Sequence, residues 1–163
     1  MGIAVSEADD ALMGRALALT AAAVQDAAVA DAAVDDVPVG AVVVDSTGTV
    51  IGEGVNLRER ENDPIAHAEL VALRHAAATV GSWNLSGCIL VVTLEPCLMC
   101  AGAVLQSRIS RLVFGAWDEK AGAAGSMYDV LRDRRLPYQA EVIAGVRAEE
   151  SRALLRSFFA SRR

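Results

Sequence analysis

The sequence has few of the residues on which small secreted proteins depend. Its 163 residues include only three cysteines and two histidines. An odd number of cysteines argues against a disulfide framework, and no basic patch precedes an apolar run near the start, as a secretory signal requires. We therefore expect a cytoplasmic protein whose cysteines serve a metal ion or a reaction.

The sequence also lacks a run that could span a membrane, although its mean hydropathy is positive. The longest stretch with few charges runs from Gly81 to Ser107. Glu95 and Pro96 lie in its middle, and a spanning helix would have to bury that carboxylate at a cost of roughly 2.5–3.5 kcal/mol or more. We expect no transmembrane segment.

The net charge of −6 is distributed unevenly along the chain. Residues 1–50 carry eight acidic side chains and one basic side chain, whereas residues 101–163 carry seven acidic and eleven basic ones. The acidic total disfavours a nucleic-acid partner, but phosphate contacts need only a local positive surface. The charges therefore weaken an RNA-related function without excluding it.

The apolar pattern predicts one α/β domain over residues 1–163. Ser6 and Asp9 form a capping-box pattern before a helix that extends to about Ala30. Strands are expected at residues 37–44, 49–55, 88–94, 111–117 and 140–146, and further helices at residues 66–80, 96–108, 127–132 and from 148 onward. Strands alternating with helices predict a three-layer α/β/α fold with a central five-stranded sheet.

A His-x-Glu pattern and a Cys-x-x-Cys pattern lie at the starts of two predicted helices. His67 and Glu69 belong to the first, and Cys97 and Cys100 follow Pro96 in the second. Cysteines three residues apart lie on one face of a helix, so both sulfurs can reach one ion. The free amides of a helix N-terminus also favour thiolates. Alone, Cys-x-x-Cys could equally be a redox pair or a chance pair of core cysteines.

The number of ligands within reach favours catalytic zinc over structural zinc. The histidine and two cysteines make three ligands, and a catalytic site keeps its fourth position for water. His75 lies about 12 Å further along the same helix, and an extended strand separates Cys88 from Cys97. Glu69 would then exchange protons with zinc-activated water. The alternatives for Glu69 are a fourth ligand or an ordinary first-turn carboxylate.

These motifs resemble a known family. His-x-Glu followed by Pro-Cys-x-x-Cys is the signature of the cytidine/deoxycytidylate deaminase-like superfamily. The chain is similar to bacterial tRNA-specific adenosine deaminases over nearly its whole length. The similar segments include Val37-Pro-Val-Gly-Ala41, Asp63-Pro-Ile-Ala-His-Ala-Glu69, Met99-Cys-Ala-Gly-Ala103 and Gly122-Ala-Ala-Gly-Ser126.

The resemblance implies the cytidine deaminase-like fold with a mixed five-stranded sheet. It implies hydrolytic conversion of adenosine to inosine at the wobble position of a tRNA anticodon. His67, Cys97 and Cys100 would hold one zinc ion per subunit, and Glu69 would be the catalytic proton shuttle. Members of the family form homodimers, with active sites near the subunit interface.

The resemblance also implies a set of substrate contacts. Asn56 would contact the purine ring. The anticodon stem-loop would meet residues of a glycine-rich loop and of the last helix, namely Asp118, Lys120, Ser126, Phe158, Phe159, Arg162 and Arg163. The chain departs from the family near this loop, because Trp117 stands where many members carry arginine and Ala121 where threonine is usual.

Several of the aromatic and basic residues have simpler interpretations. At least one of Phe158 and Phe159 is expected to pack the last helix on the sheet. Trp83 is expected to anchor the core. The basic residues in segment 132–135 could meet a phosphate or form a solvated turn.

Two rival functions would share the zinc motif. A small-molecule deaminase acting on guanine, cytosine or a nucleoside would use the same ligands. A zinc-stabilised binding module would need no proton shuttle at all. The positive excess in residues 101–163 favours RNA, whereas the acidic total favours a small molecule.

Overall fold

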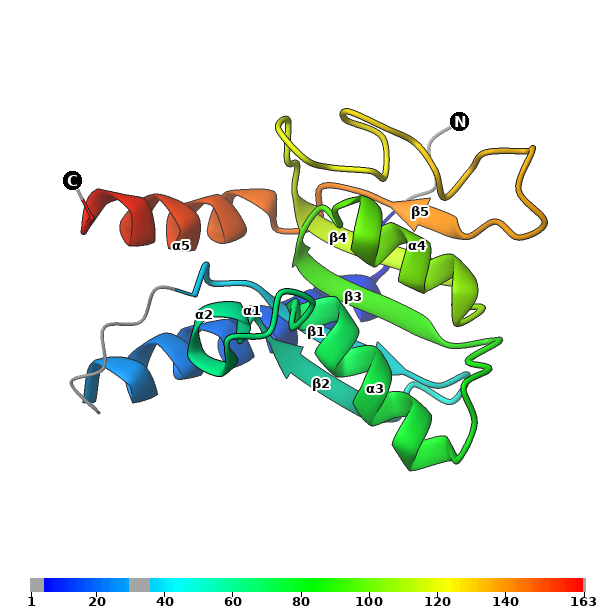
Figure 1. The fold of residues 1–163 in the computed structure, drawn as a ribbon, viewed down its shortest axis with the longest axis horizontal. Coiled ribbons are helices and arrows are strands. Elements are labelled where there is room, and N and C mark those ends of the chain that lie inside the picture. The colour runs from blue at the N-terminus through cyan, green and yellow to red at the C-terminus, as the bar shows by residue number, and fades with distance from the viewer. Residues whose placement is uncertain (1–4, 30–35, 163) are drawn as a thin grey trace.

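A β-hairpin and three parallel strands form the central sheet of the protein. The computed structural model describes residues 5–29 and 36–162. The strands are β1 (Gly40–Val44), β2 (Val50–Val55), β3 (Ile89–Leu94), β4 (Arg111–Ala116) and β5 (Glu141–Ile143). Their order is β2-β1-β3-β4-β5; β1 is antiparallel to both neighbours, and β3, β4 and β5 run parallel (Figure 1). The five-stranded mixed sheet expected from the sequence is confirmed.

Helices cover both faces of this sheet, which confirms the three-layer α/β/α arrangement. The helices are α1 (Glu7–Val29), α2 (Arg58–Glu61), α3 (Ala68–Val80), α4 (Leu98–Gln106) and α5 (Ala148–Ala160). Side chains alternate along a strand, so Val43 packs with α3 and α4 on one face while Val42 packs with Met13 and Leu17 of α1 on the other. Figure 1 shows α3 and α4 in front of the sheet and α1 behind it.

The longest helix, α1, begins at the predicted capping box. The Asp9 amide donates to Ser6 Oγ (3.1 Å), and the Ser6 amide donates to Asp9 Oδ2 (3.0 Å). The predicted helix end at Ala30 falls outside the described residues. Within residues 5–29 and 36–162, no helix is both long and apolar enough to cross a membrane.

Small residues let α3 pack closely against β2. A Cβ at Gly52 would collide with the carbonyl oxygen of Ala72, and a Cβ at Gly54 would collide with the carbonyl oxygen of Ala68. Only glycine permits this approach of helix and strand backbones. The packing fixes the start of α3, which carries the His-x-Glu motif.

The helix predicted at residues 127–132 is wrong. The amides of this segment bond to the glycine-rich loop instead of to carbonyls one helical turn earlier: Tyr128 donates to Gly122 O (3.1 Å) and Val130 donates to Ala123 O (3.1 Å). An isolated bridge also joins Ala124 to Asp129. The segment therefore closes the loop onto itself, which local helix propensity could not indicate.

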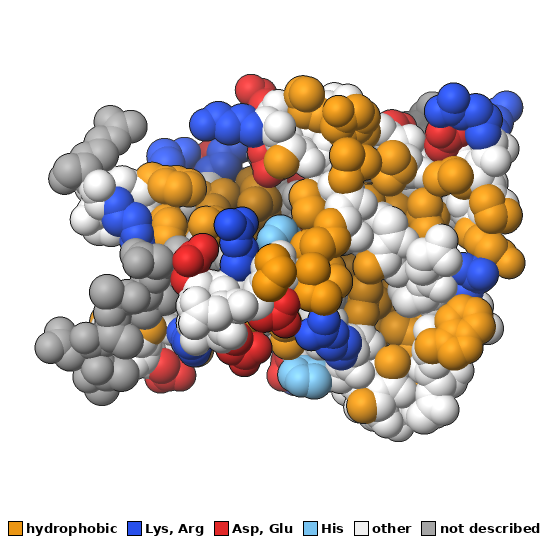
Figure 2. Space-filling view, in the orientation of Figure 1, with side chains coloured by type: hydrophobic (Ala, Val, Ile, Leu, Met, Phe, Trp, Pro, Cys, Tyr) orange, Lys and Arg blue, Asp and Glu red, His pale blue; other side chains and the backbone are white. Residues whose placement is uncertain are grey.

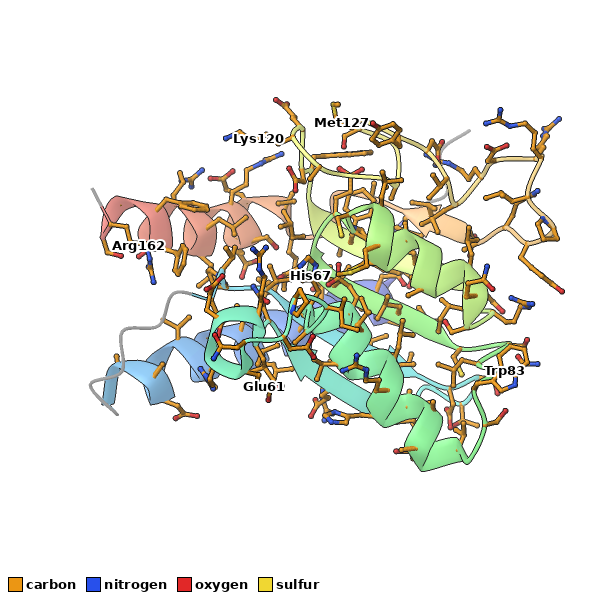
Figure 3. All side chains as sticks on the ribbon, viewed as in Figure 1. Glu61, His67, Trp83, Lys120, Met127 and Arg162 are labelled. Atoms are coloured by element: carbon orange, nitrogen blue, oxygen red, sulfur yellow. The ribbon has the colours of Figure 1, made fainter. Side chains whose placement is uncertain are left out.

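The prediction that Trp83 anchors the core is also wrong. Its side chain is 65% exposed, and the guanidinium of Arg108 lies 5.5 Å from its ring. Leu85 is buried instead, because its amide donates to Ser107 O (2.8 Å) and turns the chain inward. Trp83 lies far from His67 in the molecule (Figure 3). Cys88, in contrast, is a buried hydrophobic residue as expected.

Candidate active site

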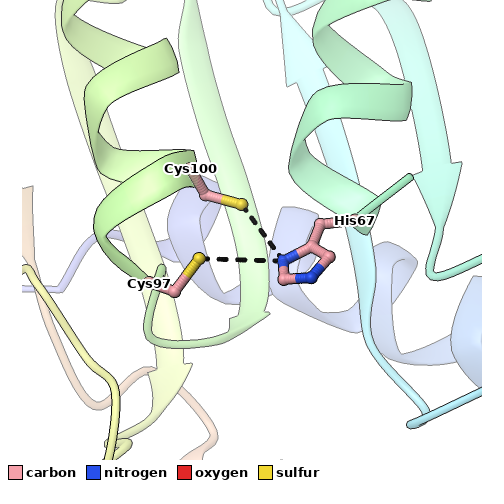
Figure 4. Close-up of side chains that lie close together, drawn as sticks. All are labelled: His67, Cys97 and Cys100. Atoms are coloured by element: carbon pink, nitrogen blue, oxygen red, sulfur yellow. Dashed lines mark hydrogen bonds between the residues drawn. The ribbon is translucent and has the colours of Figure 1, made fainter. Parts of the chain in front are cut away.

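The two motifs meet where α3 and α4 begin side by side (Figure 4). His67 is the N-cap residue of α3, and Cys97 is the N-cap residue of α4. Cys100 follows in the first turn of α4 and is buried. A turn precedes His67, in which Asp63 Oδ1 accepts the Ile65 amide at 2.9 Å. The sequence thus brings two helix N-termini, with their free amides, to one point.

The distances between the donor atoms fit a tetrahedral zinc ion. His67 Nδ1 lies 3.4 Å from Cys100 Sγ and 3.7 Å from Cys97 Sγ. Zinc–sulfur and zinc–nitrogen bonds of usual length at a tetrahedral angle would separate the two atoms by about 3.5 Å. All three donor atoms lie within 4.8 Å of one another. In the described part of the chain, this is the one group of such residues that could hold a metal ion.

Hydrogen bonding polarises the ligand set. The bond with Cys100, aided by His67, lowers the pKa of the Cys97 thiol to about 4 against the opposing effect of burial. The same bond, together with burial, raises the pKa of Cys100. The bond with Cys97 raises the pKa of His67. Cys97 is therefore a thiolate at neutral pH, the form in which cysteine binds a metal.

Glu69 lies two residues after His67 and is 4% exposed. Desolvation raises the pKa of its carboxyl group to about 7, although the nearby His67 opposes the shift. A carboxyl group with this pKa is present in both protonation states at neutral pH. That property suits a group that accepts and returns protons.

An open cavity of about 690 Å³ lies over the ligand set. On the face shown in Figure 2, a hollow that contains a histidine side chain is bordered by side chains of both charges. The residues that line the cavity include His67, Glu69, Cys97, Asn56, Arg58, Glu59, Glu95, Trp117, Asp118, Glu119, Lys120, Arg152, Leu155 and Phe159. The cavity therefore has a floor that includes His67, Glu69 and Cys97. Its wall has mixed charge and carries aromatic side chains.

The predicted substrate residues divide into two groups. Those that line the cavity are Asn56, Asp118, Lys120 and Phe159. Those outside it are Ser126, Phe158 and Arg162, and Arg163 lies outside the described residues. Ser126 donates from Oγ to Asp118 O (2.7 Å), while Arg162 lies 3.5 Å from the centre of the Phe158 ring.

Neither phenylalanine packs the last helix on the sheet. Phe159 is 53% exposed, and the half-buried Phe158 lies edge-to-face with it at 5.2 Å and belongs to neither apolar cluster of the sheet. Leu154 packs α5 against the apolar cluster instead. That expectation is wrong, and it leaves the Phe159 ring available on the cavity wall. The basic side chains of Arg132 and Arg135 pair with neighbouring aspartates, as in a solvated turn.

Motif reasoning missed several residues of the cavity wall. Arg152 and Leu155 share one face of α5 with the predicted Phe159, a pattern that the spacing of three and four residues could have indicated. Trp117 lines the cavity beside Phe114, with ring centres 4.8 Å apart. Nothing in the local sequence indicates which way the Trp117 ring faces, because that depends on the loop that follows.

A buried aspartate fixes the opposite rim of the cavity. Asp36 is 5% exposed, and its carboxylate accepts the amides of Glu59 (2.7 Å) and Arg60 (3.3 Å) at the start of the unpredicted helix α2. Asn56 donates from Nδ2 to Val37 O (3.1 Å). The side chain of Asn56 is thereby held in one orientation at the cavity wall.

Comparison with known proteins agrees with this geometry. The family description "cytidine and deoxycytidylate deaminase zinc-binding region" matches residues 13–116. That match covers more than half of the chain and includes both motifs. The chain therefore belongs to the cytidine and deoxycytidylate deaminase family.

Within this family, the chain resembles deaminases that act on tRNA. It is 51% identical over 125 residues to the tRNA-specific adenosine deaminase of Haemophilus influenzae, across 77% of this chain and 72% of the relative. A solved structure from a study of A-to-I editing by tRNA:A34 deaminases at the wobble position of transfer RNA has a TM-score of 0.77 and 37% identity, across 88% of this chain and 98% of the other.

A guanine deaminase shares the fold as well. The Nitrosomonas europaea guanine deaminase has a TM-score of 0.74 and 28% identity, across 98% of this chain and 87% of the other. The same architecture therefore serves deaminases of a free base and of a base within RNA.

Proposed function

We propose that this chain hydrolyses adenosine to inosine at the wobble position of a tRNA anticodon. The observation that carries the proposal is the buried Glu69 carboxyl beside a three-ligand set on the floor of an open cavity. The 51% identity to a tRNA-specific adenosine deaminase supports adenosine in tRNA as the substrate. The chain is an enzyme of the deaminase family, and tRNA is its partner.

The donor set suits one zinc ion per subunit, held by His67, Cys97 and Cys100. Zinc, when bound, lowers the pKa of a water molecule to about 7 and so provides a nucleophile at neutral pH. Three protein ligands would leave room for that water beside Glu69. The sulfur–nitrogen separations of 3.4 and 3.7 Å support this assignment.

Glu69 moves the protons of the reaction. As a carboxylate it accepts a proton from the attacking water, and as an acid it delivers protons to the adenine ring and to the departing amine. Water and adenosine thus give inosine and ammonia, and Glu69 returns to its starting state. Its pKa of about 7 supports both roles.

The cavity wall holds the substrate. A base within a folded RNA must leave its stack to reach the zinc site, and a cavity of about 690 Å³ can receive it. Asn56, held by Val37, contacts the purine. Asp118, Lys120 and Phe159 meet the neighbouring nucleotides. Ser126 of the loop, and Phe158 and Arg162 at the end of α5, make their contacts further out, beyond the residues that line the cavity.

We also propose a domain organisation, an oligomeric state and a cellular location for the protein. Residues 1–163 act as one deaminase domain, built on one sheet. Two copies form a homodimer, as in the family that the chain resembles, and the enzyme works in the cytoplasm, where tRNA is processed. Sedimentation of the zinc-loaded protein tests the dimer directly.

The test of the substrate compares RNA with free bases. Purified, zinc-loaded protein is incubated with an anticodon stem-loop that carries adenosine at the wobble position, and separately with adenosine, cytidine and guanine. Inosine in the stem-loop alone is the expected result. Turnover of a free base or nucleoside, with none in the RNA, would replace the tRNA assignment with a small-molecule deaminase like the guanine deaminase of similar fold.

A further inference from the structure

Glu95 is a buried carboxylate that lies outside both motifs. It follows β3 directly and precedes Cys97 by two residues, and it is 2% exposed. No lysine or arginine forms an ion pair with it among residues 5–29 and 36–162. A buried charge without a counter-ion is costly unless hydrogen bonds satisfy it. The hydrogen-bond donors to Glu95 therefore indicate the role of this buried carboxylate.

Backbone amides of a single loop, residues 118–126, satisfy this carboxylate. Oε1 accepts the amides of Ala124 and Ser126, both at 3.0 Å, and Oε2 accepts the amide of Asp118 at 2.9 Å. Hydrogen bonds to an ionised acceptor are about twice as strong as neutral ones. Both ends of the loop are thus tied to one side chain.

The loop is shaped to surround Glu95. A Cβ at Gly122 would collide with the carboxylate of Glu95 and with Ser126 Oγ, so the backbone passes as closely as glycine permits. Ser126 Oγ closes the loop by donating to Asp118 O (2.7 Å). The amide of Ala123 donates to Pro96 O (2.8 Å), next to the metal-binding turn.

This loop forms the cavity wall on which recognition depends. Asp118 and Lys120 line the cavity, and the Asp118 carboxylate accepts the Lys120 amide at 3.0 Å. Glu95 therefore connects the turn that carries Cys97 to the wall that carries Asp118 and Lys120. A change in the Glu95 carboxylate should affect the wall first, because all three of its hydrogen bonds go to loop amides.

We infer that Glu95 is a positioning residue that sets the shape of loop 118–126 for RNA recognition. The inference rests on the proposed function, in that RNA is the substrate the loop would recognise. Glu95 acts through the loop amides and takes no part in proton transfer. Its contribution should therefore appear in KM for the stem-loop far more than in kcat.

The test uses two variants that disturb the same contact from opposite sides. Glu95→Gln keeps the shape of the side chain but turns one oxygen into an NH₂ group, which faces a loop amide as donor against donor. Gly122→Ala leaves Glu95 intact and pushes the loop away from it. Glu53→Gln is the matched control, because Glu53 pairs with Arg15 at the surface and does not line the cavity.

For both variants we expect faster amide exchange at Asp118, Ala124 and Ser126, with zinc content unchanged. We expect KM for the stem-loop to rise roughly tenfold, the effect of losing one hydrogen bond to a charged group, with kcat nearly unchanged. The control should alter none of these quantities. If Glu95→Gln fails to fold, the Gly122→Ala variant still carries the test.

Two results would overturn the inference. In the first, amide exchange in loop 118–126 is no faster in the two variants than in Glu53→Gln. In the second, kcat and zinc content fall while KM stays constant, which would place Glu95 in the chemistry itself. Failure of the tRNA assignment is recognised separately, because the wild-type protein would then leave the stem-loop unmodified while the exchange result still stands.

Discussion

The floor and the outer wall of the cavity are built in different ways. The floor consists of His67, Glu69 and the two cysteines at the packed starts of α3 and α4. The outer wall consists of a loop and the exposed face of α5, where Trp117 is 40% and Phe159 is 53% exposed. Chemistry that needs fixed geometry lies on buried helix ends, and recognition lies on surfaces that tolerate change. The floor should therefore control kcat, and the wall should control KM.

A change in the ligand set should have the largest effect. Cys100→Ala removes a buried sulfur of the proposed ligand set, so we expect the variant to lose bound zinc. Its activity should fall by more than the roughly 10²–10⁴-fold that a general acid–base group alone supplies. Metal analysis and inosine formation measure the two losses. Cys88→Ala is the matched control, since Cys88 is a buried cysteine outside the site. Full zinc content in Cys100→Ala would contradict the assignment of the ligands.

A change in the wall should have an intermediate effect, visible in KM. Phe159→Ala removes an exposed ring from the cavity rim, and loss of base stacking is worth about 1–3 kcal/mol. We expect KM for the stem-loop to rise roughly tenfold with kcat and thermal stability retained. Leu136→Ala, another exposed apolar residue but outside the cavity, is the control. A fall in kcat at constant KM would remove the distinction between floor and wall.

A change remote from the cavity should affect stability alone. Burial opposes the ionisation of Asp9, but hydrogen bonds from Ser6 and the charge of Arg111 outweigh it and lower the pKa of Asp9. Because the folded-state pKa is lowered, this stabilisation is present above the unfolded value and is lost as the pH falls through the folded value. Asp9→Asn should lack this acid-dependent component and lose the charge that pairs with Arg111 (2.8 Å), at a cost of about 1–3 kcal/mol at neutral pH. The free energy of unfolding of the variant and of the wild-type protein, measured at pH 7 and below pH 4, tests this expectation.

Activity provides the control for Asp9→Asn. We expect kcat and KM for the stem-loop to match those of the wild-type protein at a temperature where both are folded. A change in KM would show that the structure around Arg111 affects the cavity wall.

The sequence predicted the floor far better than the wall. His67, Glu69, Cys97 and Cys100 could be recognised because each pair is separated by two or three residues at a helix start, where local geometry decides which side chains converge. The five-stranded sheet and the three layers followed from the alternation of strands and helices, but the order of the strands did not. These features depend on short-range patterns that a sequence displays directly.

The wall depends on contacts that no local pattern displays. Glu95 and Asp118 are 23 residues apart, and their contact exists only after the loop has closed. The helix expected at residues 127–132 is absent for the same reason, because its amides pair with the loop. Leu85 is buried where Trp83 was expected to be, since a backbone hydrogen bond rather than side-chain size decides which of them faces inward.

The most direct test of the account is the Glu69→Ala variant, measured for zinc content and for inosine formation in the stem-loop. We expect zinc content equal to that of the wild-type protein and a fall in kcat of roughly 10²–10⁴-fold. Glu53→Ala, which removes a surface carboxylate, should retain both. A Glu69→Ala variant that binds zinc and still forms inosine at the wild-type rate would show that the buried carboxyl is not the proton shuttle.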